Sequence, residues 1–280
     1  MRTMITSRTA LFVLLVVSLF VVANSDKTRA QQPLVRHKTF SGPYDSEYPY
    51  PIAEGKAGQK DPAALAEIRQ SMSATALPEQ TGIEAQGVLT RGSGKTERQS
   101  SASFVIENGS RFRMDVQEKD NTSSIRIDGR AGQAKWGNKT IESLDDIEFG
   151  YPLALPSQLL EIASRKDAAV VDDGVFVVGE HRMNKVTITL FMPRLGNPVS
   201  SSFYFNASTH FLEKSTFVNH SATNRSLEYL EIVTYEDYRQ DQSVMIPHEY
   251  LETVNGQLVM TMKITGASVT SRHDDSYFTF

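Results

Sequence analysis

The chain of 280 residues carries 29 basic and 33 acidic side chains, giving a formal net charge of −4. This balance supplies no basic stripe of the kind that a phosphate backbone requires, so nucleic acid is not expected as a partner. There are no cysteines, which excludes a cysteine nucleophile, thiolate zinc sites, iron–sulfur clusters and disulfides. A chain of this length with 40% hydrophobic residues can bury a full core without such staples.

Residues 1–30 have the pattern of a signal peptide. Arg2 and Arg8 precede the apolar run 10–23, which has the length of a signal-peptide core and is short for a bilayer span. Small residues permit cleavage before Gln31 or before Asp26, and an uncleaved membrane anchor is the alternative. A secreted eukaryotic protein of this length without cysteine would be unusual, so we expect a bacterial periplasmic protein.

Residues 31–60 are predicted to be a flexible linker, because prolines, glycines and tyrosines interrupt any periodicity. The run Tyr48-Pro49-Tyr50-Pro51 is the clearest example. Its tyrosines could instead form a short recognition motif. One folded domain is expected over 61–280.

Two helical stretches are predicted. Asp61-Pro62 starts the first, since Asp is a good N-cap and Pro suits the first helical position, and Pro78 ends it. The second lies between Leu144 and Ala163 and is broken into pieces by prolines, with Pro156 at the start of its last piece.

From Ile83 onward, apolar and polar residues alternate with a period of two, which predicts an antiparallel sheet of about ten strands with one wet face. Asn108-Gly109 and Asn255-Gly256 lie between strand-like runs and predict hairpin turns. Asp128-Gly129 and Asp173-Gly174 are similar.

Catalytic motifs are missing from the sequence. It contains no nucleophile elbow, P-loop, dinucleotide-binding glycine motif or His-Glu-x-x-His zinc motif. We therefore expect no catalytic residue, no metal and no cofactor, with an enzyme of unknown type as the alternative. His273-Asp274-Asp275 could ligate a metal, but a solvated terminal loop is the preferred interpretation.

A long sheet with one apolar face and little helix either curls into a barrel or leaves apolar surface for a ligand. The methionines at 114, 260 and 262 suit a wall that adapts to flexible acyl chains. Each candidate residue could instead belong to an ordinary packed core. The candidate residues for lining a ligand cavity are Phe104, Ile106, Phe112, Met114, Ile125, Ile127, Trp136, Met260 and Met262.

Four segments carry a resemblance to a known family: the segment 110–115 (Ser-Arg-Phe-Arg-Met-Asp), the strand-turn-strand 204–214, the segment 235–239 (Tyr-Glu-Asp-Tyr-Arg) and the segment 244–248 (Val-Met-Ile-Pro-His). Together with the signal peptide, the helices and the closing hairpin, residues 61–275 resemble the LolA/LolB-like superfamily of periplasmic lipoprotein carriers and receptors.

The resemblance implies a mainly β fold with a few helices, in the α+β class. A curved antiparallel sheet of about ten or eleven strands would form a half-open barrel, with short helices covering an apolar cavity. The sequence departs from the family pattern at Asn206, where Asp is usual, and at Gln242-Ser243, where Gly usually follows Asp241.

The resemblance further implies a non-enzymatic periplasmic monomer that binds a lipid or a lipoprotein acyl chain. An envelope-stress sensor or assembly subunit with the same fold and a protein partner is the alternative. An outer-membrane barrel ending in Phe280 is disfavoured, because Asp274 and Ser276 break the apolar alternation that precedes the C-terminus.

Overall fold

The computed structural model of the chain describes residues 48, 51, 55–76, 82–92, 97–107, 110–129, 131–137, 139–141, 155–191, 198–220 and 228–280. The elements, in chain order, are α2 (Pro62–Ala74), β1 (Gly82–Arg91), β2 (Arg98–Glu107), β3 (Arg111–Gln117), β4 (Thr122–Asp128), β5 (Ala131–Trp136), β6 (Lys139–Ile141), α3 (Pro156–Ser164), β7 (Ala168–Val178), β8 (His181–Leu190), β9 (Val199–Asn206), β10 (Leu212–His220), β11 (Glu228–Asp241), β12 (Val244–Val254), β13 (Gln257–Thr270) and the 3₁₀ turn η2 (Asp275–Phe278).

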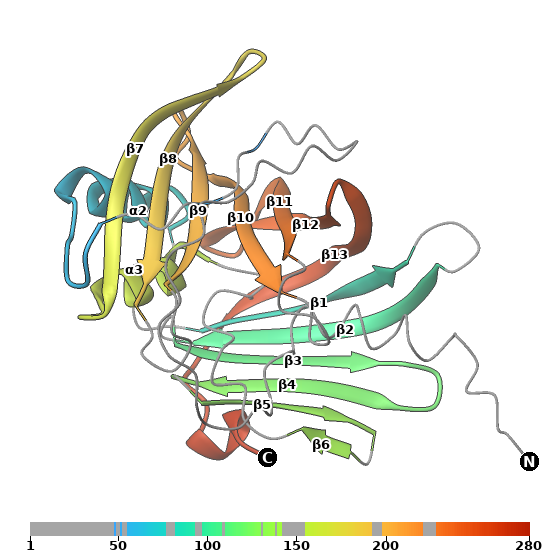
Figure 1. Cartoon of the computed structure of the whole chain (residues 1–280). Coiled ribbons are helices and arrows are strands. Elements are labelled where there is room, and N and C mark those ends of the chain that lie inside the picture. The colour runs from blue at the N-terminus through green and yellow to red at the C-terminus, as the bar shows by residue number, and fades with distance from the viewer. Residues whose placement is uncertain are drawn as a thin grey trace, which may run out of the picture.

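All thirteen strands belong to one antiparallel sheet with the order β6-β5-β4-β3-β2-β1-β13-β12-β11-β10-β9-β8-β7. Two meanders, β1–β6 and β7–β13, are joined where β1 pairs with β13. The sheet is not closed, since β6 and β7 stand at opposite ends of the order. The strands of the two meanders run in clearly different directions (Figure 1). The predicted fold class, a curved half-open barrel with few helices, is confirmed, with thirteen strands in place of ten or eleven.

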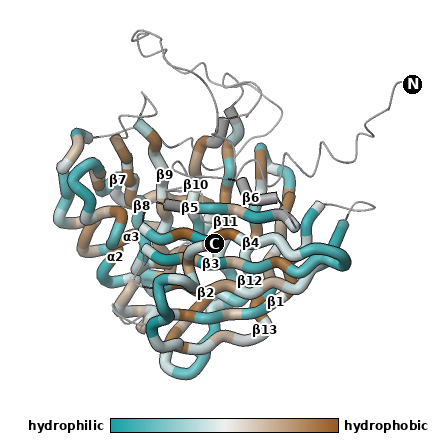
Figure 2. The backbone as a smooth tube through the Cα atoms, turned by 90° about the horizontal axis from the view of Figure 1, so that it is seen from below, coloured by the Kyte–Doolittle hydropathy of each residue, from teal (hydrophilic) through white to brown (hydrophobic). Residues whose placement is uncertain are grey.

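Alternation decides which side chains the sheet buries. Apolar and polar stretches alternate along the strands (Figure 2), because successive side chains point to opposite faces. One face, here called the inner face, packs against both helices in a single buried cluster that runs from Ile68 of α2 and Leu159 of α3 to both meanders. The opposite face is called the outer face.

The helices begin where the sequence predicts. The Asp61 carboxylate accepts a hydrogen bond from the Ala63 amide at 2.8 Å, and Pro62 is the first residue of α2. Pro156 likewise begins α3. Both helices contact each other and β7, and α2 also contacts β8, so they cover one end of the sheet (Figure 1). The earlier pieces of the second predicted helix, 144–154, lie outside the described residues.

The turns test the sequence predictions individually. Asn255 and Gly256 have φ of 48° and 77°, which is the type I′ hairpin that Asn-Gly predicts. The Asn108-Gly109 turn lies outside the described residues. The prediction for Asp173-Gly174 is wrong. Gly174 has φ of 76° and lies at a register shift within β7, with its amide bonded to the Asp172 carboxylate at 2.9 Å.

Both departures from the family pattern retain the geometry that the pattern requires. The Asn206 side-chain oxygen accepts hydrogen bonds from the amides of Ser208 and Thr209, each at 2.9 Å, which is the role that Asp would fill in an Asx turn. Gln242 has φ of 54° and lies in a two-residue loop closed by the pairing of Asp241 with Val244. Gln242 therefore occupies a left-handed position that favours glycine.

Candidate functional site

Six of the predicted cavity residues lie on the inner face of β2, β3 and β4. Phe104 of β2 pairs with Met114 of β3, which pairs with Ile125 of β4. Directly opposed residues of antiparallel strands point to the same face. The register therefore places them, together with Ile106, Phe112 and Ile127, on one side of three neighbouring strands.

Two further predicted residues lie on β13. Met262 pairs with Leu89 and Met260 with Arg91, across the seam between β13 and β1. The backbone of Trp136 in β5 pairs with that of Ser123 in β4. The structure thus brings together residues separated by more than a hundred positions in the sequence.

Seven of the predicted side chains are buried. Phe104, Met114 and Met262, with Ile106, Phe112, Ile127 and Met260, belong to the main buried cluster, and Ile125 packs against it. Whether they line a ligand site stays a prediction. Their arrangement is an apolar wall that extends well beyond β7 and β8, the strands that the helices contact most.

A charged group interrupts this wall near the β12–β13 hairpin. Glu252 pairs with Val233 of β11 and with Met260 of β13, so it shares the inner face with Glu231 and Arg91. Glu252 and Glu231 are hydrogen-bonded to each other and only 2% and 3% exposed. A carboxyl group buried this deeply in an apolar sheet face is costly to ionise.

The electrostatics of the group follow from its burial. Desolvation raises the pKa of Glu252 to about 7, against the lowering effects of Arg91 and of the hydrogen bond with Glu231. Burial lowers the pKa of Arg91, while Glu118 and Glu252 raise it. Arg91 also forms an ion pair with Glu118 at 3.3 Å. Glu252 is therefore poised to change its charge near neutral pH.

No motif predicted this group of charges, although the alternation of the strands carries a signal for it. Glu231 is in phase with Val233 and Tyr235, and Glu252 is in phase with Tyr250, all of which are buried. A carboxylate in the apolar phase of a strand is costly unless it is paired or protonated. Acidic residues at the apolar positions of a strand were therefore a better guide to a functional site than the sequence motifs.

A separate cleft of about 470 Å³ opens beside β8, β10 and β11. Its lining includes Tyr48, Lys214 and Tyr238. The Phe211 and Tyr238 rings are stacked with centroids 4.4 Å apart. Tyr48 packs edge-on against Tyr204 at 5.1 Å, so one tyrosine of the predicted linker contacts the outer face of the sheet.

Residues next to the predicted domain boundary also contact the sheet. Lys60 forms a parallel bridge with Val170 of β7, and the Gly58 amide donates to the Ala168 carbonyl at 3.0 Å. Where the linker ends stays a prediction.

The part of the chain that the structure describes holds no cluster of three or more His, Asp or Glu side chains that could bind a metal. In His273-Asp274-Asp275, both aspartates are exposed, and the side chains of His273 and Asp275 contact Glu107 and Arg111 on the outer face. None of the described helices has the length and apolar character needed to cross a bilayer.

The fold is a half-open antiparallel barrel with an apolar inner face, and several solved structures are similar to it. A LolA superfamily protein from Nitrosomonas europaea superposes with a TM-score of 0.53 at 11% identity, over 78% of this chain and 97% of the other. A putative outer membrane lipoprotein-sorting protein domain from Vibrio parahaemolyticus gives 0.52 at 7% identity, over 78% and 96%.

A DUF1329 family protein from Desulfovibrio piger gives a TM-score of 0.53 at 7% identity, over 77% of this chain and 96% of the other. No protein-family model matches the sequence, and no curated protein matches it with significant similarity. At such low identity the superpositions establish the LolA-like fold alone, which confirms the resemblance at the level of fold.

Proposed function

We propose that this chain is an exported periplasmic protein that binds a hydrophobic ligand, an acyl chain of a lipid or lipoprotein, against the inner face of its half-barrel. No bond is made or broken in this role. The observation that carries the proposal is the apolar cluster of the inner face, which extends from Met262 of β13 to Ile125 of β4 in a sheet whose two edges do not meet.

The helices are small compared with the apolar face of the sheet. They have 13 and 9 residues and contact chiefly β7 and β8, whereas the apolar cluster extends across β13, β1, β2, β3 and β4. Burying a flexible chain against such a wall contributes about 0.8 kcal/mol for each methylene removed from water. Methionines 114, 260 and 262 can adapt their shape to the bound chain.

The mature chain, purified without detergent, is expected to carry co-purified lipid in native mass spectrometry and to bind a fluorescent fatty acid. Ile125→Gln should weaken binding of this probe about tenfold, since it places a polar amide on the apolar inner face. Lys135→Gln is the matched control, because Lys135 is exposed on the outer face of β5. It should bind like the wild type.

Thermal melts of both variants separate a folding defect from a binding defect. Ile125 is only partly buried, so its substitution is expected to be tolerated. A clean apo mass, together with equal probe binding by both variants, would reject the proposal.

A further inference from the structure

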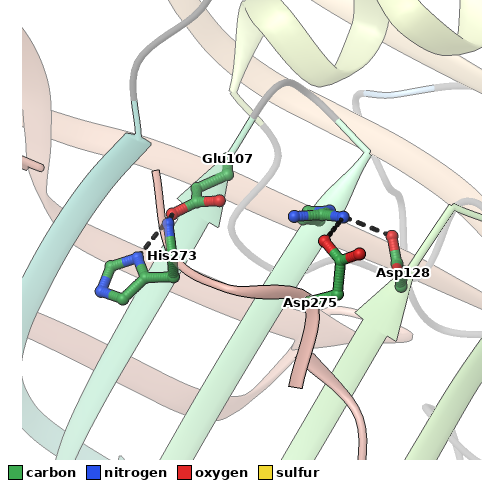
Figure 3. A network of polar contacts seen from close by, with 5 residues as sticks. Glu107, Asp128, His273 and Asp275 are labelled. Carbon is green, nitrogen blue, oxygen red and sulfur yellow. Dashed lines mark hydrogen bonds and ion pairs between the residues drawn. The ribbon is translucent and has the colours of Figure 1, made fainter. Parts of the chain in front are cut away.

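The C-terminal segment 273–280 lies on the outer face of the sheet, against β3 and β4. In Figure 2 the C-terminus lies over these strands. Its contacts use polar side chains of the sheet. His273 donates its backbone amide to the Glu107 carboxylate at 2.8 Å, and Asp275 accepts from Arg111. Figure 3 shows these two contacts side by side, with Asp128 as the second partner of Arg111.

Two further arginines make cation–π contacts with aromatic rings of the segment. The Arg113 guanidinium lies 4.2 Å from the centroid of the Tyr277 ring, and that of Arg126 lies 4.2 Å from the Phe280 ring. Arg126 also donates to the Thr279 carbonyl. Each arginine of this face therefore meets a ring, a carbonyl or a carboxylate of the segment, the contacts expected of peptide recognition.

The arginines are poorly arranged for stability alone. Arg113 and Arg126 are directly opposed across β3 and β4, and like charges at such positions are destabilising. Burial first, and Arg113 second, lower the pKa of Arg126. Without the segment, these charges would face each other, with Asp115 paired to Arg113.

The outer face also has hydrogen-bond donors that the segment does not use. Arg111 Nη1 and Arg126 Nε are buried and have no hydrogen-bond acceptor among the described residues. The side chains of Asp275 and Phe280 remain exposed, whereas Phe278 is buried. A peptide with one more acceptor could satisfy a donor that the segment leaves unpaired.

We propose that the outer face of β2–β4 is a binding site for acidic-aromatic peptides of partner proteins, and that residues 273–280 occupy it as an internal competitor. The peptide chemistry is read from the occupant: a carboxylate for Arg111, then aromatic rings for Arg113 and Arg126. This site is on the opposite face from the proposed lipid wall and stands independently of it.

The test uses the full mature chain with a weakened segment, Asp275→Asn with Tyr277→Ala and Phe280→Ala. Phe278 is retained because it is buried. The probe is a fluorescein-labelled peptide of residues 271–280, followed by fluorescence anisotropy. The variant should bind the probe about tenfold or more tightly than the wild type, because a tethered competitor acts at a high effective concentration.

Adding Arg113→Ala and Arg126→Ala to the variant should abolish this binding, and a peptide with serine at 277, 278 and 280 should not bind. Folded variant protein that fails to bind the probe would overturn the proposal. A concentration-dependent dimer in place of peptide binding would overturn it in favour of segment exchange between two copies of the chain.

If the variant does not fold, hydrogen exchange on the wild-type chain gives the answer. Millimolar unlabelled peptide should speed deuterium uptake of residues 273–280 by displacing them. Unchanged uptake at saturating peptide would overturn the proposal.

Discussion

Gly87→Ala is expected to destabilise the fold by about 3 kcal/mol or more, a large part of the stability of an ordinary domain. Gly87 lies at the register shift where β1 pairs with β13. A Cβ at this position would lie 2.0 Å from the Lys263 carbonyl oxygen and 3.0 Å from the Ile264 Cα. Both are backbone atoms, so the clash is relieved only by separating the two strands that join the meanders.

Gly266→Ala is the matched control. Gly266 lies on β13 opposite Gln86, beside the same register shift, and a Cβ there would meet no atom within 4 Å. We expect its unfolding free energy to stay within about 1 kcal/mol of the wild type. Urea denaturation of both variants measures the difference. A wild-type midpoint for Gly87→Ala would mean that β1 and β13 are not in close contact at this position.

Stability should also fall as pH rises from about 4.5 to 7, because of Glu252. Burial raises its pKa from 4.5 in the unfolded reference to about 7. In this window the folded protein binds a proton that the unfolded chain has released, so the free energy of unfolding decreases with pH. The contribution amounts to about 3 kcal/mol over the window and is constant above it.

Urea denaturation between pH 5 and pH 8 measures this dependence against that of two variants. Glu252→Gln keeps a hydrogen-bonding group of similar size and cannot ionise, so it should lose this part of the pH dependence. Glu249→Gln changes a carboxylate on the outer face of the same strand, where it pairs with Lys263 at 3.2 Å, and should retain it. The same slope in the wild type and in Glu252→Gln would show that Glu252 stays ionised or that its environment is wet.

The charge on Glu252 bears on the proposed lipid site as well. An ionised carboxylate on an apolar wall disfavours a hydrocarbon chain beside it, since apolar surroundings penalise charge. The fatty-acid titration described above can be repeated at pH 5.5 and pH 8 with the Glu252→Gln variant to separate this effect from stability.

Local chemistry was enough to predict much of the fold. Asp61-Pro62 predicted the start of α2, because an N-cap carboxylate and a proline act within one helical turn. Alternation predicted that Phe104, Met114 and Ile125 each lie on the apolar face of their strand, since the period of two holds within each strand. The Asn255-Gly256 hairpin followed from the two left-handed residues that a type I′ turn needs.

The Asp173-Gly174 prediction failed for a physical reason. Hairpin turns and β-bulges can both place a glycine at positive φ, and the two residues alone do not distinguish them. Only the partner strand does so, because β7 continues past the bulge and pairs with β8 up to Val178 and His181. The turn itself falls two residues before His181, at Gly179, which has φ of 58°.

The sequence by itself determined the class of fold, the composition of its apolar face and the absence of cysteine chemistry. The tertiary structure alone decided that β1 closes on β13, that Glu252 and Glu231 meet inside the sheet, and that the segment 273–280 covers the outer arginines. These contacts join residues far apart in the chain, and their energies depend on burial and on neighbouring charges. Local propensity carries no information about such terms, which exist only once the sheet has assembled.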